Sequence, residues 1–174
     1  MSTLWDLAIE FYQQAEIKEC CLDLQDNDGI DVCVLLAVLW LAKHDHILSS
    51  AQLKLLMANT ADWQAQMVVP LRTLRRRAKQ LREGFESDAQ TLQADIFYQQ
   101  LKQLELDGEQ LTLTRLSQLI ESKGWLINTC AGDGLTGEAN QQTKRAVEKN
   151  IRSYLSTVSE TKCDSAIRIF AQHL

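Results

Sequence analysis

The chain of 174 residues has a formal net charge of −5; 45% of its residues are hydrophobic and 24% are charged. This composition excludes a wholly disordered chain and suffices for the buried core of one domain. One proline and seven glycines are too few for the frequent turns of a sheet-rich protein. We therefore expect an all-α fold over residues 1–174, a single domain with an orthogonal or bundle-like array of about eight or nine helices.

The N-terminal segment and the cysteines indicate the compartment. Asp6 and Glu10 stand where a secretory signal needs basic and then apolar residues. The most apolar stretch, residues 32–42, is about half as long as a membrane span. Five scattered cysteines form no Cys-x-x-Cys pair, so neither a zinc site nor a disulfide framework is indicated. We expect a cytoplasmic protein with reduced thiols and no membrane association.

Three helices are predicted in the first third of the chain. Ser2 or Thr3 caps the first, and Thr3-x-x-Asp6 approximates a capping box with the shorter acid. A short second helix over residues 16–25 ends at the acidic residues 26–29. The third begins near Asp31 and is apolar on nearly all sides as far as Ala42, which is typical of a helix at the centre of a domain.

The next helices are predicted from capping residues and apolar spacing. Ser49 or Ser50 opens the fourth, and Thr60 or Asp62 opens a fifth that ends near residue 85. Pro70 either kinks this helix or occupies the first turn of a new one. Beyond the proline, apolar residues at spacings of three and four predict a core-facing side: Leu71, Leu74, Ala78, Leu81 and Phe85.

The remaining helices follow the same kinds of signal. A sixth runs from Ser87 or Asp88 to the pair 107–108, and a seventh from Thr112 or Thr114 to the pair 123–124. An eighth covers residues 143–155 and a last one residues 166–170. The loop between the seventh and eighth helices contains a glycine-rich segment, residues 130–137, that matches Gly-x-Gly-x-x-Gly. Without a surrounding parallel sheet, a loop before a helix is the favoured interpretation over a dinucleotide site.

Positive charge is concentrated in residues 61–84, which contain six basic and two acidic side chains. Five of these six basic residues recur at helical spacing, and a line of guanidinium groups suits phosphate or carboxylate partners. The five are Arg72, Arg75, Arg76, Lys79 and Arg82. The commoner outcome for such a stripe is a solvated face, or pairing with the acidic first third of the chain.

An acidic cluster precedes the apolar third helix and contains Asp23, Asp26, Asp28 and Asp31. An EF-hand loop centred on Gly29 would place two leucines at the first and twelfth ligand positions, which excludes that motif. The favoured interpretation is a turn in which Asp28 or Asp31 caps the next helix and Gly29 adopts an unusual backbone conformation. A direct ionic contact with the basic helix is a third interpretation, and no metal site is predicted.

Little in the chain suggests catalysis. Its three histidines, His44, His46 and His173, provide little material for a histidine-dependent hydrolase, and no serine lies in a nucleophile-elbow pattern. We predict no catalytic residue and no cofactor.

A family resemblance rests on two groups of residues. The first is Leu4-Trp5-Asp6-Leu7-Ala8, residues 21–26, Gly29, Asp31-Val32 and residues 35–41; the second is residues 69–72 with Arg75-Arg76. Over roughly residues 4–106, the chain resembles an uncharacterised proteobacterial family of small helical proteins. Residues 1–106 are thus the family-like part, and the helices predicted in residues 107–174 are additional to it; the resemblance supplies no activity. Cys33 stands where the family has Asn. The shared pattern includes Gln25, Asp26, Gly29, Asp31, Arg72, Arg75 and Arg76.

Three functions stay open at this point. We favour a non-catalytic binding or adaptor protein in which the acidic turn and the basic helix form one polar surface for a protein partner or small anionic ligand. Its candidate residues are Gln25, Asp26, Asp28, Asp31, Arg72, Arg75, Arg76 and Lys79. One alternative is an enzyme that acts on a phosphate or diphosphate substrate in a helical cavity, with an aspartate as base or Mg²⁺ ligand. The other is an RNA- or ribosome-associated helper, which the negative net charge disfavours.

Overall fold

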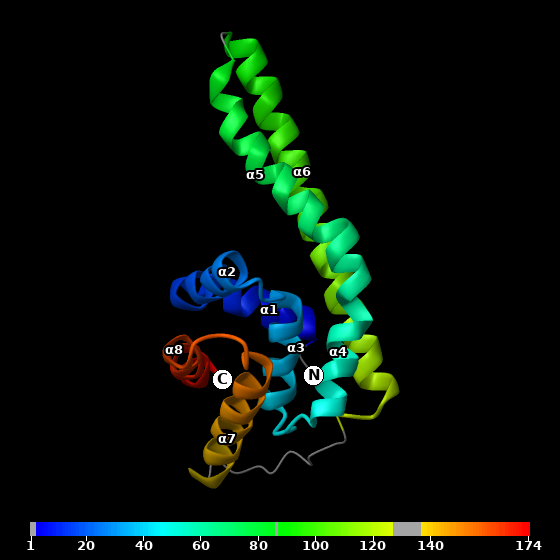
Figure 1. Cartoon of the computed structure of the whole chain (residues 1–174), viewed down its shortest axis with the longest axis vertical. Helices are drawn as coiled ribbons and strands as arrows, with labels where there is room; N and C mark the ends of the chain where they lie inside the picture. Colours follow the sequence, from blue (N-terminus) through cyan, green and yellow to red (C-terminus); the bar gives the residue numbers. More distant parts are fainter. Residues whose placement is uncertain (1–2, 86, 127–136) are drawn as a thin grey trace. The chain divides into compact units, whose positions relative to one another are not determined.

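A computed structural model describes residues 3–85, 87–126 and 137–174. All regular secondary structure in these ranges is helical, which confirms the all-α class (Figure 1). The elements are α1 Leu4–Gln13, α2 Ala15–Asp28, α3 Val32–Lys43, α4 Ser50–Trp63, a π-helical turn Gln64–Val68, α5 Val69–Leu81, a 3₁₀ turn Arg82–Gly84, α6 Asp88–Ser122, α7 Gly137–Tyr154 and α8 Glu160–His173.

The predicted number of helices is wrong, because two predicted breaks are absent. Helix α4, the π turn and α5 follow one another without interruption, and α6 continues through the pair 107–108. With Ser50–Leu81 counted as one helical stretch, the described residues form 7 helices rather than the eight or nine expected. The predicted starts at Ser50 and Asp88 are confirmed.

Pro70 explains the π turn. A proline within a helix has no N–H to donate, and its ring clashes with the carbonyl four residues earlier. The π turn immediately before α5 widens the backbone at this point, and the N–H of Val69 bonds to the carbonyl of Gln64, five residues back. Pro70 therefore lies in the first turn of α5, as one of the two sequence interpretations predicted, but the helix before it does not end.

Gly108 lies inside α6, where the sequence suggested a helix end. A Cβ atom at this position would lie 3.4 Å from Cγ2 of Val68, which is fully buried, so an alanine would be in van der Waals contact with the first stretch. The carbonyl of Gly108 accepts hydrogen bonds from the indole N–H of Trp63 at 3.1 Å and from the hydroxyl of Thr112 at 2.9 Å. These contacts place Gly108 at the interface between the two helical stretches.

The chain divides into two compact units. Unit 1 contains residues 1–59 and 113–174, and unit 2 contains Thr60–Thr112. The chain leaves unit 1 near the end of α4 and returns to it within α6. That the whole chain is one domain stays a prediction.

Unit 1 is built around α3. Every residue from Val32 to Ala42 is buried, which confirms the central position predicted for this helix. Helices α1, α2 and α7 pack against α3, and α8 packs against α2 and α7. The rings of Phe11 in α1 and Phe170 in α8 stack with centroids 6.0 Å apart. Among the described residues, none of the helices combines the length and apolarity needed to cross a bilayer.

A buried asparagine holds the connection between α3 and α4. The side-chain oxygen of Asn150 in α7 accepts a hydrogen bond from the backbone N–H of Leu48 at 2.8 Å, and its amide donates to the carbonyl of His46 at 2.9 Å. Asp45 in the same connection has a positive φ of 57° and accepts a hydrogen bond from Thr143 at 2.7 Å. Side chains of α7 thus satisfy backbone and side-chain groups that follow the apolar helix.

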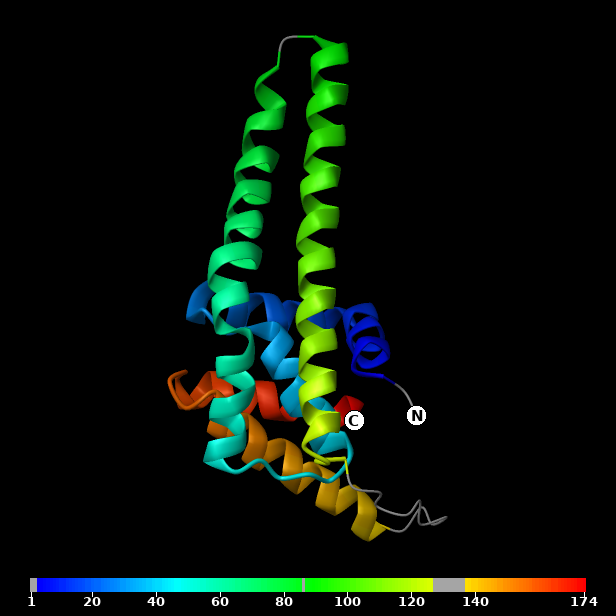
Figure 2. The same ribbon diagram turned by 90° about the vertical axis from the view of Figure 1, so that its right-hand side faces the viewer.

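Unit 2 is a hairpin of two antiparallel helical stretches. Trp63 contacts Gly108, Arg72 contacts Glu105, and Arg82 contacts Asp95. Residues further along the first stretch therefore contact residues nearer the start of α6, as in an antiparallel pair. Figures 1 and 2 show α5 and the first part of α6 side by side in both views. No residue of α5 is buried, in contrast to α3.

We predict that Asn150→Ala lowers the free energy of unfolding by about 2–3 kcal/mol, because it leaves a buried N–H and a carbonyl without partners. Urea denaturation followed by circular dichroism measures the change. Gln142→Ala on the exposed side of the same helix is the control and should change stability by less than about 0.5 kcal/mol. Equal effects of the two substitutions would contradict this role of Asn150.

Candidate functional site

The acidic turn is joined to α8 by a lysine. The ammonium group of Lys162 lies 2.7 Å from a carboxylate oxygen of Asp28 and 3.1 Å from one of Asp23. The hydrogen bonds from Lys162 and Asn27 hold the pKa of Asp23 below its usual value. Asp28 therefore pairs with the C-terminal helix, and a partner of the turn would have to compete with this ammonium group.

Asp31 and Gly29 have structural roles that the sequence indicated. The Asp31 carboxylate accepts hydrogen bonds from the backbone N–H groups of Cys33 at 2.9 Å and Val34 at 3.4 Å, which caps α3. Gly29 has a φ of 68° and ends α2 in the left-handed conformation that glycine adopts readily. The hydroxyl of Tyr154 donates to the Asp31 carbonyl at 2.8 Å, so α7 is fixed to the same turn.

Arg72 and Arg75 of the basic helix pair with glutamates of α6. Arg72 lies 2.9 Å from Glu105 and 2.7 Å from Glu109, and Arg75 forms an ion pair with the same Glu105. Glu105 is only 6% exposed. The hydrogen bond to Glu105 raises the pKa of the Arg75 guanidinium. These two cations hold the hairpin together, and an anionic ligand would have to displace carboxylates that already neutralise them.

The other candidates lie at the surface. Gln25 donates a long hydrogen bond of 3.5 Å to its neighbour Asp26, and Arg76 and Lys79 are exposed on α5. The acidic turn belongs to unit 1 and the basic helix to unit 2. That the two form a single polar surface stays a prediction.

The hairpin exposes a set of apolar side chains that the sequence analysis assigned to the core or did not discuss. Each lies seven residues from the next on its own helical stretch, and their exposed fractions range from 43% to 60%. They are Met67, Leu74 and Leu81 on the first stretch and Phe97, Leu104 and Leu111 on α6. We call this set the apolar face.

The six residues of the apolar face lie at matching levels. The ion pairs of Arg72 with Glu105 and Arg82 with Asp95 set the register of the hairpin. In that register, residues 67, 74 and 81 are level with residues 111, 104 and 97, respectively. The apolar side chains therefore form three successive cross-helix pairs.

Helical geometry places both rows on the same side of the hairpin. Met67, Leu74 and Leu81 each directly precede a residue that contacts α6, namely Val68, Arg75 and Arg82. The α6 row likewise precedes Tyr98, Glu105 and Thr112, of which Tyr98 and Glu105 contact arginines of the first stretch. In two antiparallel right-handed helices, the positions directly before contact positions turn toward the same side.

A depression near the end of the hairpin supports this arrangement. Leu81 and Phe97 line the same hollow of about 410 Å³, together with Phe85 and Ala94. The contact positions between the two helices are mostly polar or charged, and the apolar rows flank them, so the larger apolar side chains of the hairpin are the ones left for another element to cover.

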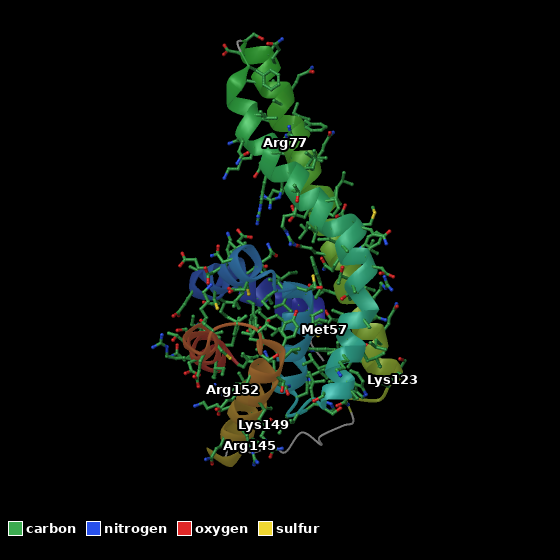
Figure 3. The ribbon with its side chains drawn as sticks, in the orientation of Figure 1. Met57, Arg77, Lys123, Arg145, Lys149 and Arg152 are labelled. Carbon is green, nitrogen blue, oxygen red and sulfur yellow. The ribbon has the colours of Figure 1, made fainter. Side chains whose placement is uncertain are left out.

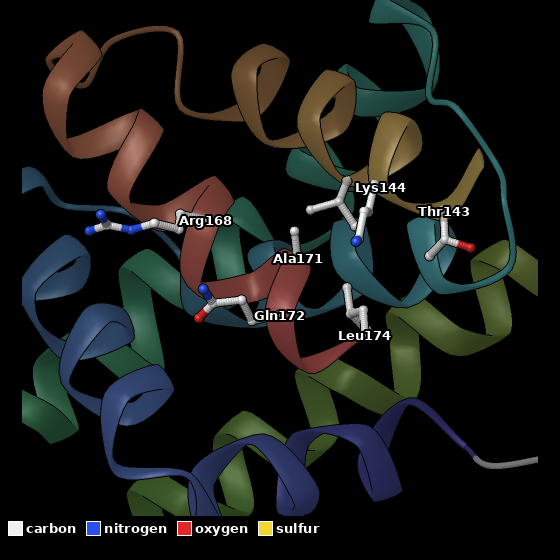
Figure 4. A pocket seen from close by; sticks show the side chains of 7 residues that line it. Thr143, Lys144, Arg168, Ala171, Gln172 and Leu174 are labelled. Atoms are coloured by element: carbon white, nitrogen blue, oxygen red, sulfur yellow. The ribbon is translucent and has the colours of Figure 1, made fainter. Parts of the chain in front are cut away.

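A second hollow, of about 580 Å³, lies between α7 and α8 (Figure 4). Figure 4 shows the guanidinium group of Arg168 directed away from the other labelled side chains, so it does not converge with Lys144 on one point. Arg145, Lys149 and Arg152 give α7 a basic side (Figure 3), where Arg152 pairs with Glu148 and Asp164. This hollow lacks the convergent polar groups of a ligand site.

The described cysteines form no disulfide, and burial raises the pKa of two adjacent ones. Cys20, Cys21, Cys33 and Cys163 are all reduced. Burial, with smaller contributions from neighbouring groups, raises the pKa of Cys20 to about 11 and that of Cys21 to about 12. Such thiols stay protonated at neutral pH, so they cannot act as the attacking thiolate.

The histidines and the glycine-rich motif complete the predicted features. Nδ1 of His44 donates a hydrogen bond to the Trp40 carbonyl at 2.8 Å, and the His46 ring stacks on Trp125. Across the described ranges, no group of three metal-ligating side chains is close enough to hold an ion. The Gly-x-Gly-x-x-Gly match lies outside the described residues, except for Gly137, which begins α7.

The sequence analysis missed the apolar face and the glutamates of α6. It assigned Leu74, Leu81 and Phe85 to the core, but each is 47% exposed or more. The sequence does contain a signal for the apolar face: apolar residues repeat every seven positions at 67, 74 and 81 and again at 97, 104 and 111. The position of Glu105 opposite the arginines needs the register of the hairpin, which spacing alone does not provide.

Together, the fold and these contacts define an all-α protein with a helical hairpin that is neutralised internally and apolar on one side. Comparison with known families identifies the chain more closely. It belongs to the family described as "Protein of unknown function (DUF2390)", whose model matches residues 3–116. This confirms the predicted family resemblance and extends it to residue 116. No curated protein and no solved structure matches the chain.

We predict that Asp31→Ala lowers the free energy of unfolding by about 1 kcal/mol, because α3 loses its N-cap. Asp31→Asn should retain most of the stability, since asparagine caps helices about as well as aspartate. Thermal and urea unfolding measure both variants. If Asn were as damaging as Ala, the carboxylate charge rather than the cap would be what matters at this position.

We predict that Glu105→Gln lowers the free energy of unfolding by about 2 kcal/mol, because Arg72 and Arg75 lose a shared, nearly buried carboxylate. Asp107→Asn is the control: it lies two residues away on the exposed side of α6 and should change stability by less than about 0.5 kcal/mol. Urea denaturation of the two variants compares them. Unchanged stability of the Glu105 variant would contradict a structural role for the ion pairs.

Proposed function

We propose that this protein is a non-catalytic cytoplasmic binding or adaptor protein of bacteria, and that it binds an amphipathic helix of a protein partner on the apolar face of its hairpin. The observation that carries the proposal is the apolar face itself: six side chains, level in pairs and 43–60% exposed. A helix that presents its own apolar stripe to this face would complete a small helical bundle.

The charges of the hairpin support a protein rather than a phosphate ligand. Arg72 and Arg75 are already neutralised by Glu105 and Glu109, so they lack the unpaired charge that a phosphate clamp needs. The six residues of the apolar face are uncharged, and the exposed charged residues between them on the two helices, Arg77 and Asp107, have opposite signs, whereas nucleic-acid sites are rich in exposed cations. A contiguous exposed apolar surface is the ordinary mark of a protein interaction site.

The bound helix should carry acidic residues along one edge. Helix α5 has five basic and no acidic side chains, so acidic groups on the edge that passes α5 would be attracted to it. Cysteines that form no disulfide among the described residues support a reducing compartment such as the cytoplasm.

Site-specific photo-crosslinking in cells tests the proposal. A photoreactive phenylalanine analogue replaces Phe97 on the apolar face or, as a matched control, Lys102 on the charged side of the same helix. We predict a discrete protein adduct from position 97 that is absent from position 102 and falls at least about tenfold when Leu104→Ser is added. The adduct should map by mass spectrometry to a helical segment of the bound protein.

Two results would contradict the proposal. One is the absence of any adduct from position 97 in a variant that folds normally by circular dichroism. The other is an equal set of adducts from positions 97 and 102, which would show non-specific exposure rather than a binding surface.

A further inference from the structure

We infer that the helices bound by the apolar face come from a second copy of this chain, so that two hairpins pack into an antiparallel four-helix bundle. The inference rests on the proposed function and names its partner. Two features of the hairpin carry it: the apolar face is continuous across both helices, and the charges of the two helices are opposite.

The shape of the apolar face fits another hairpin better than a single helix. The two rows run along both helical stretches through three levels, from Met67 and Leu111 to Leu81 and Phe97. One added helix seats in the groove between the rows and leaves their outer edges exposed. A second hairpin presents two rows of its own, so each apolar row meets another one.

The charge distribution makes the hairpin complementary to itself. Arg72, Arg75 and Arg82 form ion pairs with Glu105, Glu109 and Asp95 inside the hairpin. Apart from these, α5 has three exposed basic side chains and no acidic one, whereas residues 88–112 of α6 have two exposed acidic side chains and one basic one: Arg76, Arg77 and Lys79 on α5, and Asp88, Asp107 and Lys102 on α6. A two-fold axis brings the same surface together from both copies, so a self-complementary surface must carry both signs. This hairpin does so, with one helix of each sign.

The charges also select one of two symmetric arrangements. With the two-fold axis along the bundle, α5 of one copy lies beside α6 of the other, and the hairpin ends point the same way. With the axis across the bundle, α5 lies beside α5, and the basic residues of both copies meet. Coulomb repulsion disfavours the second arrangement, so we assign the first.

Sedimentation equilibrium of the purified full chain tests the inference. We expect a monomer–dimer equilibrium with a dissociation constant in the micromolar range or below. Leu104→Ser should raise that constant about 100-fold, because the substitution occurs twice in each dimer. The matched control is Leu106→Ser, which alters a leucine of similar exposure two residues away and off the apolar face, and which should leave the constant unchanged within about twofold.

A charge reversal tests the arrangement. Arg77 is exposed on α5 (Figure 3), and Arg77→Glu places an acid beside the acidic helix of the other copy in the assigned arrangement. The dimer should weaken about fivefold or more at low salt, and added salt should reduce the difference. In the alternative arrangement the same substitution relieves repulsion and strengthens the dimer, so a tighter dimer would overturn our assignment.

The outcomes separate the inference from the proposed function. If the protein is a monomer at all concentrations but still forms position-97 adducts with a different protein, the inferred dimer is wrong and the proposed binding of a partner helix is retained. If it is a monomer and forms no such adducts, both the dimer and the proposed function are wrong. A dimer that Leu104→Ser and Leu106→Ser affect equally uses another surface and also overturns the inference. Circular dichroism of each variant shows that a lost dimer is not a lost fold.

Discussion

The burial of α3 on all sides is the constraint on which unit 1 depends. A helix with no polar side must be surrounded, and the burial of every residue from Val32 to Ala42 requires neighbours in every direction. Helices α1, α2 and α7 supply them, and the polar groups at the two ends of α3 are satisfied by side chains: Asp31 at its start and Asn150 just beyond its end. The acidic turn before α3 is thus explained by the start of a buried helix.

The hairpin of unit 2 is held together by different contacts from those of unit 1. Its two helices meet through ion pairs and a glycine contact more than through large apolar residues, since Arg72 and Arg75 occupy contact positions and share Glu105. Charged pairs at a partly buried seam fix the register but stabilise less than close apolar packing. The larger apolar side chains stand on the flanking side instead. This division is what one expects of a hairpin that completes its core with helices from outside the chain.

Much of unit 1 could be predicted from the sequence, because its signals are local. The Thr3 capping box, the Gly29 end of α2 and the Asp31 start of α3 depend on a few neighbouring residues, and each is confirmed. The wrong predictions concern features that depend on contacts between residues far apart in the sequence. Gly108 and the residues near Thr60 look like helix ends, yet Gly108 lies inside α6 at a contact with Trp63, and the π turn before Pro70 lets the first stretch continue. The assignment of Leu74 and Leu81 to the core failed for a related reason: periodicity shows that a side is apolar and does not show what covers it.

The central claim is that the apolar face of the hairpin is covered by a second copy. Hydrogen–deuterium exchange at low and high protein concentration tests it most directly, because association protects only the amides of the segments that it stabilises. We expect the amides of α5 and of residues 88–112 to exchange more slowly at high protein concentration, while those of α3 exchange at the same slow rate at both concentrations. Hairpin exchange that is independent of concentration would contradict it.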